Sequence, residues 1–485
     1  MNDRPNLVYI FADDMGYGDL SCLNEESKIR TTHMDRVADE GMIFTDAHSS
    51  SAVCTPSRYS LLTGRYNWRS ELKQGVLYGY SGRLIEEDRM TVASFLQEHG
   101  YYTACVGKWH LGLDWQRSGS DPDQVDYTKP IGGGPTAVGF DAFFGISASL
   151  DMPPYVYIEG DGVTAVPDHE TGNDDEKAFW RAGPTAPDFR HEEVLPRCTD
   201  RVCEIVAERA SEDAPFFIYF PLPAPHTPIL PTPEFQGASG TNEYGDFVLQ
   251  VDAVVGRVCD ALERAGVAEN TILIVSSDNG CSPRAGFEEL AEVGHNPSYV
   301  FRGHKADIYE GGHRIPLIVR WPSRVAAGTT THQTVCLSDL LATMASILGT
   351  PLPDYAGEDS VSNLPLWSGN DAPVREATVH HSINGSFSIR RGHWKLEMCP
   401  GSGGWSHPKP GLETEGLPPI QLYDLRTDIG ERKNIYDQEP AVVEELKALL
   451  TRYVRDGRST PGAPQSNTGA RYWPQLNWLV EADLQ

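Results

Sequence analysis

The chain has 485 residues, 40% of them hydrophobic, and a formal net charge of −28 at pH 7. This length exceeds the size at which one hydrophobic core stops growing, so we expect a large domain and a smaller one. The acidic charge disfavours binding to nucleic acid or to anionic membranes, and no apolar run reaches the roughly 20 residues of a membrane helix. The nine cysteines are dispersed without a C-x-x-C pair, which favours a reducing compartment and argues against a zinc site.

The first residues, MNDRPNLVYIFADD, contain no basic segment followed by an apolar run. As it stands, the chain is therefore expected to be cytoplasmic, or periplasmic or secreted if a leader has been removed. These patterns carry no prediction of the oligomeric state.

Short apolar runs alternate with helix-compatible segments from the start of the chain to about residue 321. The expected strands are residues 6–12, 101–107, 214–222, 271–277 and 315–321, and the expected helices include 91–100 and 243–266. The strands lack polar alternation, as do strands buried on both faces of a parallel sheet. This rhythm predicts an α/β domain with a large, mixed but mostly parallel sheet flanked by helices. Residues 114–192, rich in Gly, Pro and Asp, are expected to form loops.

The pattern changes after residue 370. Residues 386–399 and 420–428 are expected strands of an antiparallel unit, and 440–457 has amphipathic helix spacing. We therefore expect a large α/β domain over residues 1–370, a smaller C-terminal α+β domain with an antiparallel sheet over 371–458, and a tail over 459–485 that packs on the body.

Polar side chains follow several expected strands, at the sheet edge where open α/β sheets bind their ligands. Asp13 and Asp14 follow the first strand, and Asp278 and Asn279 follow the strand at 271–277. These hard oxygen donors suit Ca²⁺ or Mg²⁺, and three adjacent carboxylates would repel one another without a cation. Either pair alone is more typical of a turn or a helix cap, but two pairs at separate strand ends predict a metal site.

A second set of side chains is cationic or able to become so. Its members are Arg58, Lys108, His110, His226 and Lys305. An isolated Lys or Arg is usually a solvated surface group, whereas Lys108 stands between apolar and glycine residues at a strand end. A metal and several cations together are suited to gripping a tetrahedral oxyanion.

The segment Cys54-Thr55-Pro56-Ser57-Arg58, followed by Leu62-Thr63-Gly64-Arg65, resembles the C-x-P-S-R-x-x-x-L-T-G-R element of the type I sulfatases. These are formylglycine-dependent, arylsulfatase-like enzymes of the alkaline phosphatase superfamily. The Asp-Asp pair, GKWHLG, PHTP, SSDNG, GHKADIYEGGHRIP and LYDL stand in the order of that family, so the resemblance covers most of the chain. It implies an alkaline-phosphatase-like fold and a hydrolase that cleaves a sulfate monoester, on a carbohydrate in our interpretation, with aryl sulfates as surrogate substrates.

The resemblance implies that Cys54 is oxidised to formylglycine by a formylglycine-generating maturation enzyme, which reads Pro56 and Arg58. An oxygen nucleophile would also explain why no His partner for a thiolate lies near Cys54 in the sequence. The implied metal is Ca²⁺, with Mg²⁺ as the alternative. Its implied ligands are Asp13, Asp14, Asp278, Asn279 and the modified residue 54.

The resemblance also implies how the sulfate ester is cleaved. Lys108, Lys305 and His226 would contact the sulfate, and Arg58 would help to hold the aldehyde and the metal. A diol oxygen of residue 54 would attack sulfur while His226 protonates the departing alcohol. His110 would then deprotonate the second diol hydroxyl, so that sulfate leaves. Ser149 resembles a family serine near the diol.

Two alternatives remain at this point. The first is a phosphonate monoester or phosphodiester hydrolase with the same cysteine-derived nucleophile. The second, less favoured, is a non-catalytic carbohydrate-binding homologue, which would be expected to have lost metal or cation residues; none is lost here.

Candidates for substrate binding lie in segments without strong periodicity. Trp405, and with it Trp109, Trp115 and Tyr80, are candidates for stacking on a sugar ring. His407 or Arg69 are candidates for contacting its hydroxyls, with plain packing as the alternative for the aromatic residues. The acidic net charge favours a small or singly sulfated saccharide over a long polysulfated chain.

Overall fold

The computed structural model describes residues 4–479. Its centre is a sheet of ten strands in the order β13-β2-β12-β11-β1-β10-β4-β5-β6-β7. The middle strands are β1 (Asn6–Ala12), β4 (Tyr102–Lys108), β10 (Phe216–Pro221) and β11 (Thr271–Ser277). They are parallel to one another, which confirms the expected parallel core. Nearly all their residues are buried, which explains why their sequences show no polar alternation.

The outer strands make the sheet mixed. On one side, β12 (Leu317–Arg320) is antiparallel to β11 and is followed by β2 (Met42–Phe44) and β13 (Thr329–Thr331). On the other side lie β5 (Ala142–Ile146), β6 (Ile158–Glu159) and β7 (Gly162–Val163). The expectation of loops over 114–192 is wrong for these strands and for the hairpin of β8 (His169–Asn173) and β9 (Trp180–Thr185).

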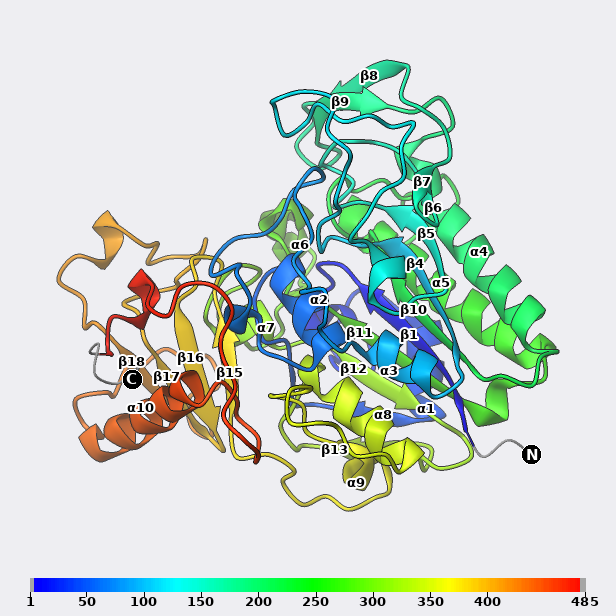
Figure 1. Cartoon of the computed structure of the whole chain (residues 1–485). Helices are drawn as coiled ribbons and strands as arrows, with labels where there is room; N and C mark the ends of the chain where they lie inside the picture. Colours follow the sequence, from blue (N-terminus) through cyan, green and yellow to red (C-terminus); the bar gives the residue numbers. More distant parts are fainter. Residues whose placement is uncertain (1–3, 480–485) are drawn as a thin grey trace.

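Helices cover the sheet in two groups (Figure 1). In one, α5 (Glu243–Arg264) contacts α1 (Thr32–Asp39) and α4 (Val194–Arg209). In the other, α8 (Leu340–Leu348) contacts α2 (Cys54–Thr63) and α3 (Val92–Glu98). Three short helices complete the large domain: α6 (Phe287–Glu292), α7 (Glu310–His313) and α9 (Leu364–Trp367). In residues 4–479, no helix combines the length and the apolar character needed to cross a membrane.

A separate antiparallel sheet of four strands, on the left in Figure 1, confirms the smaller C-terminal α+β unit. Its strands are β15 (Thr378–His381), β16 (Phe387–Arg391), β17 (Trp394–Glu397) and β18 (Gln421–Asp424), and α10 (Pro440–Arg455) packs on β16 and β17. The expected strand 386–399 is a hairpin, because Gly392 has a φ of 58° and turns the chain.

Two features join the C-terminal unit to the large domain. β3 (Ala47–His48) pairs with β14 (Val335–Cys336) within the large domain, and Ser51, which follows β3 on the way to Cys54, forms a parallel bridge with His381 at the end of β15. The chain after α10 runs back over the body: the Ser459 amide donates to the Glu358 carbonyl and the Thr468 amide to the Arg69 carbonyl. The domain boundaries stay predictions, and residues 480–485 of the expected tail lie outside the described residues.

Candidate active site

The carboxyl ends of three parallel strands bring together the residues predicted to bind a metal. Asp13 and Asp14 follow β1, Lys108 closes β4, and Asp278 and Asn279 follow β11. Each of these side chains is 0% or 1% exposed. Because parallel strands end at the same edge of the sheet, five polar groups converge there from separate parts of the chain.

The oxygen donors contact one another directly. The Asp14 amide donates to Asp278 Oδ1 at 3.1 Å, and Asn279 Nδ2 donates to Asp14 Oδ1 at 2.8 Å. Asp13 Oδ1 and Asn279 Oδ1 are buried and accept no hydrogen bond within the described chain. Buried oxygens without a donor are costly, and carboxylate and amide oxygens are the ligands that Ca²⁺ and Mg²⁺ prefer. The donor set therefore fits a hard divalent cation.

A buried cation lies against each carboxylate. The pairs are Lys108–Asp13, Lys305–Asp14 at 2.7 Å and Arg58–Asp278 at 2.9 Å. Although burial acts to raise it, Lys108, His226 and Arg58 hold the pKa of Asp13 well below its usual value. Burial and the neighbouring Asp13 raise the pKa of Asp278 to about 7. The carboxylates are thus crowded enough for a further positive charge to stabilise them.

Cys54 is the first residue of α2 and is 2% exposed. Its sulfur and one side-chain atom each from Asp13, Asp14 and His226 lie within 4.8 Å of one another. Burial raises the pKa of the Cys54 thiol, so the thiol stays uncharged at neutral pH. A neutral buried thiol is a poor nucleophile, which agrees with a residue that acts only after conversion.

The C-terminal end of α2 explains the glycine of the motif, Gly64. Gly64 caps the helix with a φ of 64°, in the left-handed region that glycine adopts without strain. A Cβ at this position would lie 3.0 Å from the Ser360 Cβ. Gly64 therefore ends the helix and permits close packing against the segment that carries Glu358 and Asp359.

His110 and His226 flank the cluster. His110 has a φ of 56°, and its Nε2 lies 2.8 Å from the Leu77 carbonyl, while its Nδ1 has no hydrogen-bond partner in the part of the chain that the structure describes. His226 Nε2 is 3.7 Å from Asp14 Oδ2. Burial lowers the pKa of both, and nearby Lys108 adds to the effect. The Ser149 hydroxyl is buried without a hydrogen-bond partner in residues 4–479.

Thr55 is a contributor that the sequence did not reveal. Its hydroxyl accepts a hydrogen bond from the Leu77 amide at 3.2 Å, and the Leu77 carbonyl is the one that His110 contacts. Thr55 thereby links the nucleophile helix to the loop that orients His110. Its place directly after Cys54 was the available signal, but the motif treats this position as variable.

Trp405 and His407 lie on one loop of the C-terminal unit. The Trp405 amide donates to Asp307 Oδ1 at 2.8 Å, two residues from Lys305, and the Trp405 ring is 41% exposed. The His407 side chain is 75% exposed and its Nδ1 lies 2.7 Å from Glu413 Oε2. In the described range, neither side chain has a hydrogen bond or ion pair to the Cys54 cluster.

Three other substrate candidates are wrong. Trp109 is fully buried and donates to the Gly112 carbonyl, and Trp115 is 5% exposed and donates to the Gly79 carbonyl. Both indoles pack in the core, where no sugar can reach them. Arg69 is also fully buried, and its guanidinium donates to Asp359 and to the Tyr453 carbonyl, so it is not available to a substrate hydroxyl.

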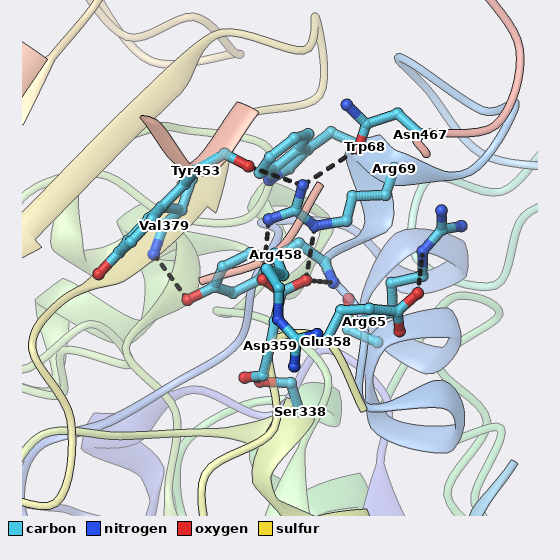
Figure 2. A network of polar contacts seen from close by, with 12 residues as sticks. Arg65, Trp68, Arg69, Ser338, Glu358, Asp359, Val379, Tyr453, Arg458 and Asn467 are labelled. Carbon is cyan, nitrogen blue, oxygen red and sulfur yellow. Dashed lines mark hydrogen bonds and ion pairs between the residues drawn. The ribbon is translucent and has the colours of Figure 1, made fainter. Parts of the chain in front are cut away.

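Arg69 belongs to a buried network that joins α2 to the C-terminal unit (Figure 2). Its Nε and Nη2 donate to Asp359 at 2.7 and 2.9 Å, and its Nη1 donates to the Tyr453 carbonyl at 2.9 Å. Arg65, the last motif residue, pairs with Glu358 at 3.2 Å and donates to the Ser466 carbonyl at 2.7 Å. These arginines therefore anchor the chain that follows α2, and their donors are used by acceptors of the protein.

Comparison with known proteins decides the family. The sequence profile of the sulfatases matches residues 5–350. The chain belongs to the sulfatase family. This sulfatase is 35% identical to an N-acetylgalactosamine-6-O-sulfatase of Bacteroides thetaiotaomicron over 93% of each chain. It is 31% identical to human arylsulfatase A, over 96% of this chain and 91% of the relative.

A solved structure from work on glycosaminoglycan metabolism by Bacteroides thetaiotaomicron has the same fold as the sulfatase. Its TM-score is 0.81 at 34% identity, and the match covers 93% of this chain and 99% of that one. The sulfatase is a sulfuric ester hydrolase with the alkaline-phosphatase-like fold expected from its sequence. The comparisons favour this activity over the phosphonate monoester or phosphodiester hydrolase considered above.

Proposed function

We propose that this enzyme removes a 6-O-sulfate from an N-acetylgalactosamine residue of a small, singly sulfated saccharide. We infer this substrate from the 35% identity to an N-acetylgalactosamine-6-O-sulfatase across 93% of both chains. The net charge of −28 supports the small substrate, because it repels a long polyanion. Trp405, exposed two residues beyond the Gly403 turn, is the proposed stacking platform for the sugar, with His407 beside it.

The proposed metal is Ca²⁺, with Mg²⁺ as the alternative. Asp13, Asp14, Asp278, Asn279 and the modified residue 54 would hold it, and the unpartnered oxygens of Asp13 and Asn279 support this set. When bound, the metal supplies positive charge that stabilises the non-bridging oxygens of the sulfate as sulfur is attacked. The proposed maturation converts Cys54 to formylglycine, whose hydrated form is a gem-diol.

The remaining chemistry falls to this chain's own residues. Lys108 and Lys305 bind the sulfate oxygens, in a buried site where charge stabilisation is strong. One diol hydroxyl of residue 54 would give its proton to a neighbouring carboxylate of the site and attack sulfur with its oxygen, the bond from sulfur to the sugar oxygen would break, and His226 would give that sugar oxygen a proton. His110 then takes the proton of the second hydroxyl, the aldehyde C=O forms, and sulfate leaves by C–O cleavage. Water restores the diol.

Arg58 and Ser149 complete the proposed site. Arg58 is buried, bonds Asp278 and the Lys108 carbonyl, and therefore orients groups on two strands. Ser149 offers an unpartnered buried hydroxyl, which we assign to the substrate side of the diol.

A desulfation screen tests the proposal. The enzyme is produced with a formylglycine-generating enzyme, and intact mass establishes conversion of Cys54. Defined saccharides sulfated at the 6-position or the 4-position of N-acetylgalactosamine, or at the 6-position of N-acetylglucosamine, are compared with aryl sulfate and aryl phosphate. We expect the highest kcat/KM on 6-sulfated N-acetylgalactosamine and none for Cys54→Ala. Faster turnover of another sulfated position rejects the substrate, and faster turnover of the phosphate rejects the reaction.

A further inference from the structure

Three buried histidines form a second cluster where the C-terminal sheet meets the large domain. His48 lies in β3, His313 ends α7 and His380 lies in β15. All three are 0% exposed. One ring nitrogen from each lies within 4.8 Å of the others. The cluster thus joins three segments that are far apart in sequence, and it shares no residue with the proposed active site.

Each imidazole has an acceptor or hydroxyl on its outer side. His48 Nε2 is 2.8 Å from Asp46 Oδ1, and His313 Nε2 is 3.2 Å from the Ile308 carbonyl. Carboxylate and carbonyl oxygens only accept, so a proton on the outer nitrogen of each ring satisfies these contacts and leaves the inner nitrogen free to bind a metal. Arg390 Nη1 also approaches His48 Nε2, at 2.9 Å, but it has Asp46 Oδ1 as an acceptor at 2.6 Å.

In that tautomer the inner nitrogens face one another as lone pairs. His48 Nδ1 and His313 Nδ1 are 3.0 Å apart. His380 Nδ1 lies 3.1 Å from the Ser388 hydroxyl, and His380 Nε2 has no hydrogen-bond partner among residues 4–479. Two unprotonated nitrogens at this distance repel unless a positive charge lies between them. Metal-binding histidines have this arrangement: the outer nitrogen bonds an acceptor and the inner one binds the ion.

The surrounding charges leave room for a cation. Four carboxylates and three cationic side chains form one buried network: Asp46, Glu310, Glu397 and Glu431 with Arg314, Arg390 and Lys395. With all of them ionised, the carboxylates exceed the cations by one. An excess of one negative charge offsets half of the charge of a divalent cation, and burying a charge without such compensation is costly.

We propose that His48, His313 and His380 bind a divalent transition metal, Zn²⁺ in the first instance, at a site separate from the active-site cation. Imidazole donors suit Zn²⁺ at about 2.0–2.1 Å, which sets tetrahedral ligands about 3.3 Å apart. The observed separations, from 3.0 Å to at most 4.8 Å, require only small ring movements. Calcium, which takes oxygen ligands, is a poor match.

Metal binding requires a change in the stacking of His313 on His380. The His313 and His380 rings are parallel, with centroids 3.8 Å apart and an interplanar angle of 7°. A metal lies near the plane of each imidazole that binds it, so one of these rings has to tilt when the ion binds. The site contains no cysteine, which is why the cysteine pattern argued against zinc. Its role is structural: it ties β3, which leads to Cys54, to β15 of the C-terminal sheet.

The experiment measures zinc in the full-length protein, saturated with Ca²⁺ and freed of loosely bound metal. We expect about one zinc per chain, retained against a weak chelator. Anomalous diffraction above the zinc edge should place the ion among the three rings. His380→Gln should lose the zinc, whereas His381→Gln, a neighbouring buried histidine outside the cluster, should keep it.

The position of the ion decides the outcome. A zinc peak only at the Asp13–Asp14 site, no peak at the three histidines in the unsubstituted protein, or an unchanged zinc content in His380→Gln overturns the proposal. If either variant fails to fold, the anomalous map of the unsubstituted protein still decides. None of these measurements depends on sulfate hydrolysis, so this test is independent of the proposed function.

Discussion

Replacing Arg69 by Met is expected to destabilise the protein without changing its affinity for substrate. Methionine keeps the apolar stem but removes the guanidinium that gives Asp359 two hydrogen bonds, at 2.7 and 2.9 Å. Asp359 is fully buried and would retain a bond from the Tyr66 amide at 2.7 Å. The substitution therefore leaves a buried carboxylate without its cation.

The magnitude follows from the cost of breaking a buried ion pair, about 3–5 kcal/mol. Loss of the contact between the guanidinium and the Trp68 ring, 4.0 Å away, adds to it. An unfolding entropy of about 2.1 cal/mol/K per residue gives about 1 kcal/mol/K for the 485 residues, if they unfold as one unit. The expected fall in Tm is therefore about 3–5 °C.

Calorimetry measures the Tm, and aryl sulfate kinetics measure KM. The matched control is Arg391→Met, which breaks an exposed pair with Glu445 whose side chains are 42% and 62% exposed. That variant should lose at most about 1 kcal/mol. The double variant Arg69→Met/Asp359→Asn should recover part of the loss, because no charge is then left unpaired. A Tm fall no larger than the control's, or a raised KM at unchanged Tm, would refute the structural role of Arg69.

Three further predictions concern the proposed active site. His226→Ala should lower kcat on a sugar sulfate by about 10²–10⁴-fold but affect 4-nitrophenyl sulfate much less, because its phenolate leaves without a proton; equal losses on both substrates would contradict the assigned acid. Asp14→Asn should weaken Ca²⁺ binding by at least about tenfold in calorimetric titration, since a charged ligand is removed; unchanged affinity would exclude Asp14 as a ligand. Trp405→Ala should raise KM for the saccharide and leave the aryl sulfate unaffected; a change in kcat alone would count against stacking.

The central fold could be predicted because its strands carry their signal locally. The buried runs that became β1, β4, β10 and β11 are continuous and apolar, and each ends in a turn or a polar residue. The direction of β12 could not be predicted in this way. A strand buried on both faces has the same composition whether its neighbour is parallel or antiparallel, so only the path of the chain decides.

The β5 strand was not predicted from the sequence, for a related reason. It is five residues long, Ala142–Ile146, and it stands in a stretch rich in glycine and proline. Its pairing with β4 is what makes it a strand. Stability that comes from a partner distant in sequence leaves little mark on the local pattern.

The tryptophans considered for sugar binding show the same limit of prediction from local sequence. Trp109 and Trp405 are both tryptophans beside charged residues of interest, yet one is fully buried and the other is 41% exposed. Residue type predicted an affinity for sugar rings in both cases. Solvent access, which depends on every segment that packs above the residue, separated them.

The sequence alone predicts the proposed nucleophile and the proposed oxygen donors. The maturation implied for Cys54 acts on the unfolded chain, so its signal has to be contiguous, and Asp13, Asp14, Asp278 and Asn279 stand directly after strands that are themselves readable. Packing between distant segments decided which charges are anchors: Arg58 meets Asp278, one of the proposed metal ligands, whereas Arg65 and Arg69 meet Glu358 and Asp359. It also brought His48, His313 and His380 into one cluster. The physical reason is that the partner of a buried polar group is set by long-range packing, and no local pattern of residues encodes a contact between segments hundreds of residues apart.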